Sequence, residues 1–185
     1  MTEIDTLGFL ELNSIAKGIE AVDFMLKAAD CQLISAKASC PGKYYILISG
    51  KVDSIDRSIS EGARIGGMHV VGKLVIPRIN PQVIRAINMT HIPDDTRAVG
   101  AIEYYSAAGS IIAADYAVKA ADVELISLQL ATGIAGKSFV VLTGDVDSVR
   151  AAVEAGIEGA KEEAMIINHI VLPNPRKELI NSLVF

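Results

Sequence analysis

The sequence has few aromatic residues and no tryptophan. Phenylalanine and tyrosine make up 5% of the 185 residues, whereas hydrophobic residues make up 51%. The core must therefore be built from Ala, Ile, Val and Leu, which suits closely packed helices. An excess of basic residues is also lacking, since the formal net charge is -5. Binding to phosphates requires clustered Lys and Arg, so nucleic acid is not expected as a partner.

Long apolar runs and secretion signals are missing as well. The most apolar helical segment, Ser110 to Ala121, is interrupted by Asp115 and Lys119, whereas a membrane span needs about 20 residues almost free of charge. The N-terminal stretch MTEIDTLGFLEL lacks the basic and apolar regions of a signal peptide. Two cysteines, Cys31 and Cys40, give no disulfide framework. We therefore expect a cytoplasmic protein with no membrane partner.

An internal duplication is the main feature that is present. Residues 7–35 align with residues 99–127 at a constant offset of 92, and 14 of the 29 positions are identical. Further on, GKVDSIDRSISEG matches GDVDSVRAAVEAG, and LVIPR matches IVLPN. Each half is therefore one folding unit. The predicted domains are residues 1–90 and 99–185, with residues 91–98 as the linker.

Each repeat is predicted to be a small α/β (α+β) unit. In the first repeat the hydrophobic patterns predict strands at 7–12, 32–37, 44–50 and 69–77, helices at 15–29 and 53–64, and a short helix at 81–87. Ile19, Val22 and Leu26 lie on one side of the first helix, which is the spacing that predicts it. Asp53 is expected to cap the second helix, because its short carboxylate can accept from the free amides of the first turn.

Cys40 lies at the tip of the predicted hairpin, in the stretch SCPGK. Pro41 favours an extended backbone at the preceding residue, and Gly42 can adopt the positive φ that a type II turn requires. We therefore expect a rigid loop to present Cys40. Cys31 is replaced by Val123 in the second repeat, so we interpret Cys31 as a packing residue.

These motifs resemble the bacterial microcompartment shell domain. The shared features are the strand with Gly and Glu, the helix that ends DFMLKAAD or DYAVKAAD, the GK hairpin, the DVDSV or KVDSI helix start and the terminal IP or LP. The duplication is similar to the trimeric branch of that family, in which three two-domain chains form a pseudohexameric ring. The resemblance implies two tandem shell domains, each a small antiparallel or mixed sheet flanked by helices. It also implies a homotrimer that tiles the microcompartment shell with other shell proteins.

The SCPGK loop resembles the propanediol-utilisation type within that branch, whose pore-loop cysteine holds an iron-sulfur cluster. The resemblance implies that Cys40 from three chains binds one 4Fe-4S cluster per trimer, on the three-fold axis. The cluster would carry electrons, or be exchanged, across the shell, with an encapsulated or cytosolic redox protein as a further partner. The remaining pore-loop residues would be Ser39, Pro41, Gly42, Thr132, Gly133, Ile134 and Ala135.

Lys27 and Lys119 occupy matching positions, each four residues after an aspartate. An i,i+4 ion pair on a helix explains this spacing in ordinary terms. The resemblance instead assigns both lysines to the edge that contacts a neighbouring ring, together with Arg78. The second repeat has Asn174 where the first has Arg78, which leaves the geometry of its edge undetermined.

Two alternatives remain open. The pore could be empty and serve as a gated passage for metabolites, or the chain could be a regulatory protein that binds a small ligand, as some ferredoxin-like domains do. His69, His91 and His169 have no metal-ligand spacing, and no nucleophile-and-base set is indicated. The GIAGKS stretch lacks the first glycine of a phosphate-binding loop. We therefore do not expect an enzyme.

Overall fold

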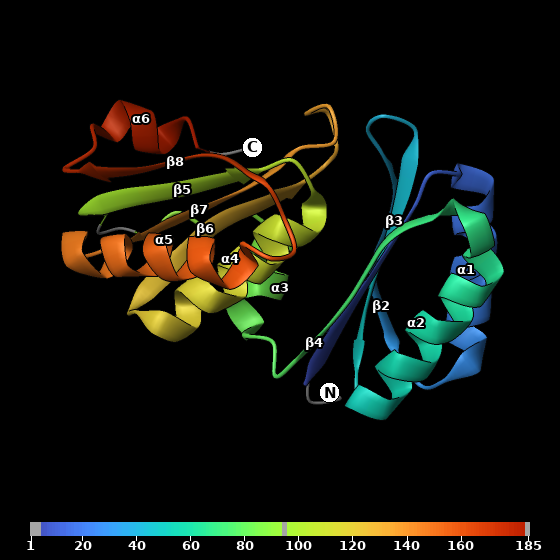
Figure 1. Ribbon diagram of the computed structural model, residues 1–185. Helices are drawn as coiled ribbons and strands as arrows, with labels where there is room; N and C mark the ends of the chain where they lie inside the picture. Colours follow the sequence, from blue (N-terminus) through green and yellow to red (C-terminus); the bar gives the residue numbers. More distant parts are fainter. Residues whose placement is uncertain (1–4, 94–95, 184–185) are drawn as a thin grey trace. The chain divides into compact units, whose positions relative to one another are not determined.

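The computed structural model describes residues 5–93 and 96–183, which form two compact units that divide between Ile79 and Asn80. Figure 1 labels the helices and strands of each unit. The first unit contains β1 (Thr6–Leu12), α1 (Ile15–Ala28), β2 (Gln32–Ser39), β3 (Lys43–Gly50), α2 (Val52–Gly66), the 3-10 turn η1 (Gly67–His69) and β4 (Val70–Pro77). Their order follows the strand and helix pattern predicted from the sequence.

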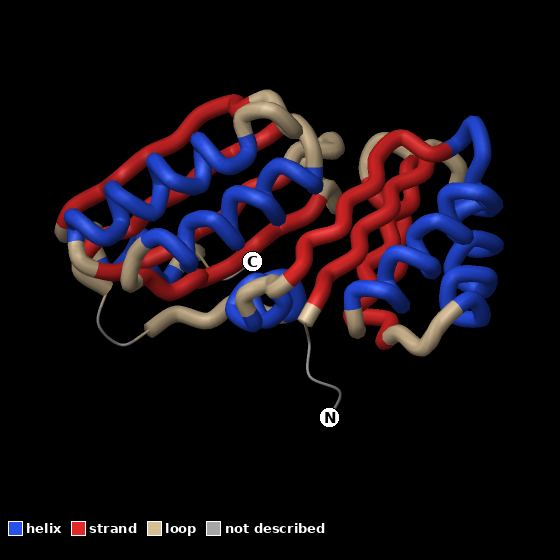
Figure 2. Tube along the Cα trace, turned by 60° about the horizontal axis from the view of Figure 1, so that its bottom comes forward, coloured by secondary structure: helices blue, strands red, loops and turns tan. Residues whose placement is uncertain are grey.

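The first unit is a four-stranded antiparallel sheet in the order β2-β3-β1-β4, with α1 and α2 packed together against it. Figure 2 shows the two helices side by side next to the strands. Alternate residues of β1 and β3 point toward the helices, and they form a core of Leu10, Leu12, Ile46 and Ile48 around Met25 of α1. The core is aliphatic, as the composition requires.

The second unit repeats this arrangement. It contains α3 (Pro81–Asn88), β5 (Ala98–Tyr104), α4 (Ala107–Ala120), β6 (Val123–Leu130), β7 (Ser138–Gly144), α5 (Val146–Ala160), β8 (Ile166–Pro173) and α6 (Lys177–Asn181). Its sheet has the order β6-β7-β5-β8 and is antiparallel throughout. The predicted fold class is therefore confirmed, with two antiparallel sheets that are each flanked by helices.

The short helix α3 packs on the second unit although the repeat alignment joined it to the first domain. It contacts β6 and α4, and Val83, Ile84 and Ala86 are buried. Asn80 caps the helix by accepting from the backbone of Gln82 at 2.9 Å. The compact unit thus begins at residue 80, whereas the predicted linker spans residues 91–98.

The apolar side of α1 is only partly covered by the first unit. The helix buries Gly18, Ala21 and Met25, whereas Ile19 is 58% exposed and Leu26 is 39% exposed. Small residues face the sheet because the helix approaches it closely: a Cβ atom on Gly18 would lie 2.4 Å from the ring of Tyr44. Of the larger apolar side chains of α1, Met25 lies in the core of the first unit and Val22 packs against it, whereas Ile19 and Leu26 are exposed.

The predicted cap of the second helix was wrong. The helix α2 begins at Val52, with Lys51 as its N-cap residue and no hydrogen bond from a capping side chain. Asp53 instead lies in the first turn, where its negative charge still interacts favourably with the helix dipole. The hydrophobic pattern located the helix but not its first residue.

Tyr104 at the end of β5 makes the stability of the second unit sensitive to alkaline pH. Its side chain is fully buried, and its hydroxyl donates to the carbonyl of Gly156 at 3.4 Å. Burial raises the pKa of Tyr104 to about 12, above the ordinary value of about 10. Its contribution is therefore fully present below about pH 10 and is lost as the pH rises through 12.

We expect the Tyr104→Phe variant to lose less stability at alkaline pH than the wild type. The difference should approach about 2 to 3 kcal/mol in the free energy of unfolding near pH 12. Urea denaturation between pH 9 and pH 12 measures it. Tyr105→Phe is the matched control, because Tyr105 is 57% exposed. Parallel pH profiles for wild type and Tyr104→Phe would contradict the assignment.

Candidate functional site

The loop between β2 and β3 presents Cys40, as predicted. Cys40 follows the last residue of β2 and carries a free, half-buried thiol. Pro41 and Gly42 are exposed, and Gly42 has a φ of 74° with open space around it. The positive φ at Gly42 was predicted, while the cis peptide bond between Cys40 and Pro41 was not. The loop places one sulfur atom at the tip of the hairpin.

Ser39, directly before Cys40, is 7% exposed. Its hydroxyl has no hydrogen-bond partner among the residues that the structure describes. A buried hydroxyl without a partner costs about 1 to 3 kcal/mol. Packing of Ser39 in this loop therefore costs free energy, and no atom from outside the chain reaches its hydroxyl in this conformation.

An ion pair at the base of the hairpin holds the loop in place. Nζ of Lys43 donates to Oε2 of Glu11 at 3.1 Å, and the Glu11 side chain is 7% exposed. In the second unit Lys137 donates to Glu103 at 3.3 Å in the same way. The lysine of the GK motif and the glutamate of the first strand thus form an ion pair in each unit. Both residues recur in the two repeats, and this recurrence could have identified the pair from the sequence. Neither glutamate was among the predicted site residues.

The matching loop of the second unit, between β7 and β6, carries no thiol. Thr132, Gly133 and Ala135 are exposed, and Ile134 is half-buried. The loop contains four residues with positive φ, namely Ala131, Gly133, Ala135 and Gly136. The backbone amide of Lys137 donates to the carbonyl of Ile134 at 3.1 Å. The two hairpin loops therefore occupy equivalent places in the two units but differ in chemistry.

Within the described residues, no group of three or more His, Cys, Asp and Glu side chains could hold a metal ion. Cys31 packs against the core of the first unit, with the hydroxyl of Ser58 at 3.5 Å from its sulfur atom, so its predicted packing role is confirmed. His69 contacts Asn13 at 2.9 Å. Any metal centre based on Cys40 must therefore draw its other ligands from other chains.

The two candidate edge lysines differ in their surroundings. Lys27 bonds Asp23 at 2.5 Å, and their side chains are 70% and 58% exposed. Lys119 bonds Asp115 at the same distance, but Asp115 is 4% exposed and also accepts from the backbone amide of Asn80 at 2.9 Å. The ordinary helical ion pair is thus present in both repeats, and both lysine side chains remain accessible.

Arg78 and Asn174 share one backbone conformation although their side chains differ. Their φ angles are 52° and 48°, and each directly follows the proline that ends β4 or β8. Asparagine tolerates this left-handed region better than most residues do. The departure from arginine in the second repeat therefore changes the charge of this side chain but not the local path of the chain.

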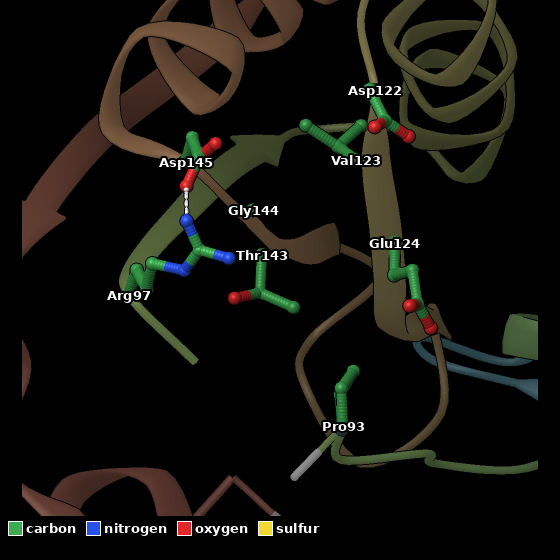
Figure 3. Close-up of a pocket in the computed structure, with 8 residues that line it drawn as sticks. All are labelled: Pro93, Arg97, Asp122, Val123, Glu124, Thr143, Gly144 and Asp145. Carbon is green, nitrogen blue, oxygen red and sulfur yellow. Dashed lines mark hydrogen bonds and ion pairs between the residues drawn. The ribbon is translucent and has the colours of Figure 1, made fainter. Parts of the chain in front are cut away.

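A polar pocket of about 400 Å³ lies in the second unit (Figure 3). Its lining includes Asp122, Glu124, Asp145 and Arg97, and Arg97 donates to Asp145 at 2.5 Å. Figure 3 shows this ion pair on one wall and Asp122 and Glu124 on another. The carboxylates make the pocket a poor site for an anionic metabolite. None of the predicted site residues lines it.

Known proteins resemble this chain along nearly its whole length. The bacterial microcompartment shell protein PduT from Citrobacter freundii is 40% identical over 178 residues, which cover 96% of this chain and 97% of that protein. The carboxysome assembly protein CcmO from Synechocystis sp. is 25% identical, with 96% of this chain and 64% of that protein covered. The first of these relatives therefore matches in length as well as in sequence.

Solved structures give the same result. A microcompartment protein from Desulfitobacterium hafniense superposes with a TM-score of 0.91 at 42% identity, covering 97% of this chain and 99% of that chain. The fused permuted hexameric shell protein MSM0275 shares the fold, with a TM-score of 0.63 at 20% identity over 84% of this chain and 81% of that chain.

No helix within the described residues is long and apolar enough to cross a bilayer.

The family comparison agrees with the internal duplication. The BMC domain model matches residues 6–79 and again residues 98–175. These two segments contain both four-stranded sheets and both hairpin loops. The chain belongs to the BMC domain family and is a tandem-domain shell protein of a bacterial microcompartment.

Proposed function

We propose that this shell protein forms a homotrimeric tile in which Cys40 from three chains binds one 4Fe-4S cluster on the three-fold axis. The observation that carries the proposal is the half-buried free thiol at the tip of one hairpin, in only one of the two repeats. A three-fold ring of two-domain chains brings three such thiols together and no more. Three cysteine ligands leave one iron of a cubane cluster without a ligand from this chain.

The residues of this loop fit such a group in their chemistry. Cysteine thiolate is the usual ligand of iron-sulfur clusters, and the thiol lies where neither the core nor a disulfide engages it. The ion pair between Lys43 and Glu11 keeps the base of the hairpin fixed, so that the thiol needs little reorganisation to act as a ligand.

A bound cluster would accept and release single electrons. The tile would then carry electrons, or exchange clusters, between an encapsulated or cytosolic redox protein and the other side of the shell. The contribution of this chain is to hold the sulfur atoms and to fix the loop. We propose no catalytic role for it, since the relatives that it resembles are shell and assembly proteins.

The second candidate is the same tile with an empty pore that admits metabolites. The exposed loop tips favour this alternative, because the Cβ positions of Gly42 and Gly133 have open space around them. The regulatory small-ligand protein is supported by the polar pocket of the second unit alone. A role in binding a small ligand at this pocket does not explain why the whole chain is duplicated.

The experiment that tests the proposal is the purification of the protein without oxygen. Sedimentation analysis should give a trimer, and elemental analysis should give about 1.3 iron and 1.3 sulfide per chain, as expected for one four-iron cluster per three chains. A colourless trimer that takes up no iron on reconstitution would favour the empty pore. A protein that never assembles would contradict the tile itself.

A further inference from the structure

The hairpin that carries Cys40 has charged side chains of one sign only. From the start of β2 to the end of β3, the charged residues are Lys37 and Lys43. The matching strands and loop of the second unit contain Glu124 and Lys137, one residue of each sign. The hairpin with the thiol is therefore cationic, whereas its counterpart has no net charge.

One of the two lysines carries a charge that nothing in the hairpin balances. Nζ of Lys43 bonds the nearly buried carboxylate of Glu11 at 3.1 Å, so this pair has no net charge. Lys37 is exposed, and it forms no ion pair with any residue in the ranges 5–93 and 96–183. The free positive charge of the hairpin therefore belongs to Lys37.

Lys37 and Cys40 occur in the same repeat, and the other repeat has neither. Lys37 lies opposite Tyr45 in the ladder of β2 and β3. The residue in the same register of the second unit, opposite Phe139, is Gln129. Because the strand forms with a lysine or with a glutamine at this position, folding does not require the charge. The charge thus accompanies the thiol and not the fold.

The charge of Lys37 lies near enough to act on whatever approaches the thiol. Lys37 precedes Cys40 by three residues, which corresponds to about 10 Å at the rise of an extended strand. This distance is about one Debye length at physiological salt, so the charge is only partly screened. In the proposed tile, on which this inference rests, three copies of Lys37 surround the axis that the three thiols share.

The second unit carries the opposite charge. The first unit has nine basic and nine acidic residues, whereas the second has eight basic and thirteen acidic residues, so the second unit accounts for the whole net charge of -5. Its exposed carboxylates include Glu162 and Glu163, in the turn before β8. In the sheet, β5 separates β8 from the hairpin strand β7. A negatively charged protein is therefore repelled by the second unit as a whole and attracted by the Cys40 hairpin.

We propose that the surface formed by the three Cys40 hairpins docks an acidic one-electron carrier protein, and that Lys37 steers this partner to the cluster. The partner has Asp and Glu side chains around its own redox centre. One electron passes from the reduced carrier to the cluster, whose core changes from a charge of about 2+ to about 1+. The carrier is oxidised by that one electron, and no proton or other atom is transferred. Lys37 acts on the approach of the partner and is not a ligand of the cluster.

The first test uses Lys37→Gln, which introduces the residue of the second unit at the matching position. The reduced donor is an acidic [2Fe-2S] ferredoxin, mixed with the oxidised trimer without oxygen in a stopped-flow instrument. Electrostatic steering raises association rates by a factor of about 10 to 1,000. We therefore expect the second-order rate constant to fall about tenfold at about 0.1 M salt, where the Debye length is about 10 Å. Near 1 M salt, where it is about 3 Å, the variant and the wild type should react equally fast.

Lys51→Gln is the matched control. Lys51 is exposed and follows β3 at the end opposite the Cys40 loop, as Figure 1 shows from the start of α2. The length of β3 separates the two places by about 25 Å, which exceeds two Debye lengths at about 0.1 M salt. The control removes the same charge from the same unit, and its rate constant should change less than about twofold. Iron analysis verifies that both variants carry the cluster.

A second donor separates steering from an effect of Lys37 on the cluster itself. Reduced methyl viologen is a small cation, so Lys37 cannot attract it. If the substitution lowered the driving force for electron transfer to the cluster, both donors would react more slowly. Loss of steering slows the acidic ferredoxin and leaves the rate with methyl viologen unchanged or slightly higher.

The outcomes separate this inference from the proposed cluster. Slower reaction of Lys37→Gln with ferredoxin, but not with methyl viologen, supports the docking. A Lys37→Gln variant that reacts as fast as Lys51→Gln overturns the docking and leaves the cluster standing. Equal slowing with both donors also overturns it, because Lys37 then acts on the cluster and not on the partner. A wild type that binds no iron overturns the proposed function and this inference together.

Discussion

Replacing Cys40 with serine is expected to remove all bound iron and the visible absorbance of the protein, while the trimer keeps its size. The thiolate is the ligand, and a serine hydroxyl at this position binds iron poorly because it stays protonated at neutral pH. The loop tip contributes little to the core, since Pro41 and Gly42 are exposed. The free energy of unfolding should therefore change by less than about 0.5 kcal/mol.

Cys31→Ser is the matched control for this experiment. Cys31 lies against the core of the first unit, beside Ser58, so its loss should reduce thermal stability but leave the iron content unchanged. Absorbance spectra and iron analysis of both variants, prepared without oxygen, provide the comparison. Iron retained by Cys40→Ser, or lost by Cys31→Ser, would refute the assignment of Cys40 as the ligand.

The double variant Lys27→Ala with Lys119→Ala is expected to form trimers that no longer assemble into sheets. Both ammonium groups are accessible at matching places, and a tile edge must bind copies of itself through groups that recur around the ring. Removing exposed charges has little effect on folding, so the trimer should survive. Electron microscopy of the variant, alone and mixed with other shell proteins, measures the loss of sheets.

The two lysines should differ in their effect on stability. Lys119→Ala leaves the nearly buried Asp115 without its cation, although the amide of Asn80 still donates to it. We expect this change to cost about 1 kcal/mol of unfolding free energy, and Lys27→Ala to cost less. The control is Lys17→Ala with Lys161→Ala, which removes two exposed lysines with i,i+3 partners. Sheets formed normally by the Lys27 and Lys119 variant would contradict the edge assignment.

The architecture could be predicted from the sequence because the duplication gives two sequences for each strand and helix, and their hydrophobic patterns can be compared. Where the repeats agree, as in the strands and the hairpin with its GK motif, the predicted elements match the structure. The position of Cys40 at the hairpin tip followed from the turn residues Pro41 and Gly42. The first residue of α2 was missed, since neither Lys51 nor its neighbours supply a capping side chain.

The hydrophobic pattern could not predict which of two matching side chains in the repeats is buried. Leu33 and Leu125 are the same residue in the same register, yet one is exposed and the other is buried. The difference depends on α3, which lies far from β6 in the sequence. The exposure of Ile19 and Leu26 on α1 could not be predicted for a related reason, because periodicity identifies an apolar stripe without saying what covers it.

The position of α3 also determines how damage to this helix would be detected. Because α3 is tethered to the surface that it covers, its effective concentration there is in the millimolar range or above and does not depend on how much protein is present. A defect in α3 should therefore lower the melting temperature equally at every dilution.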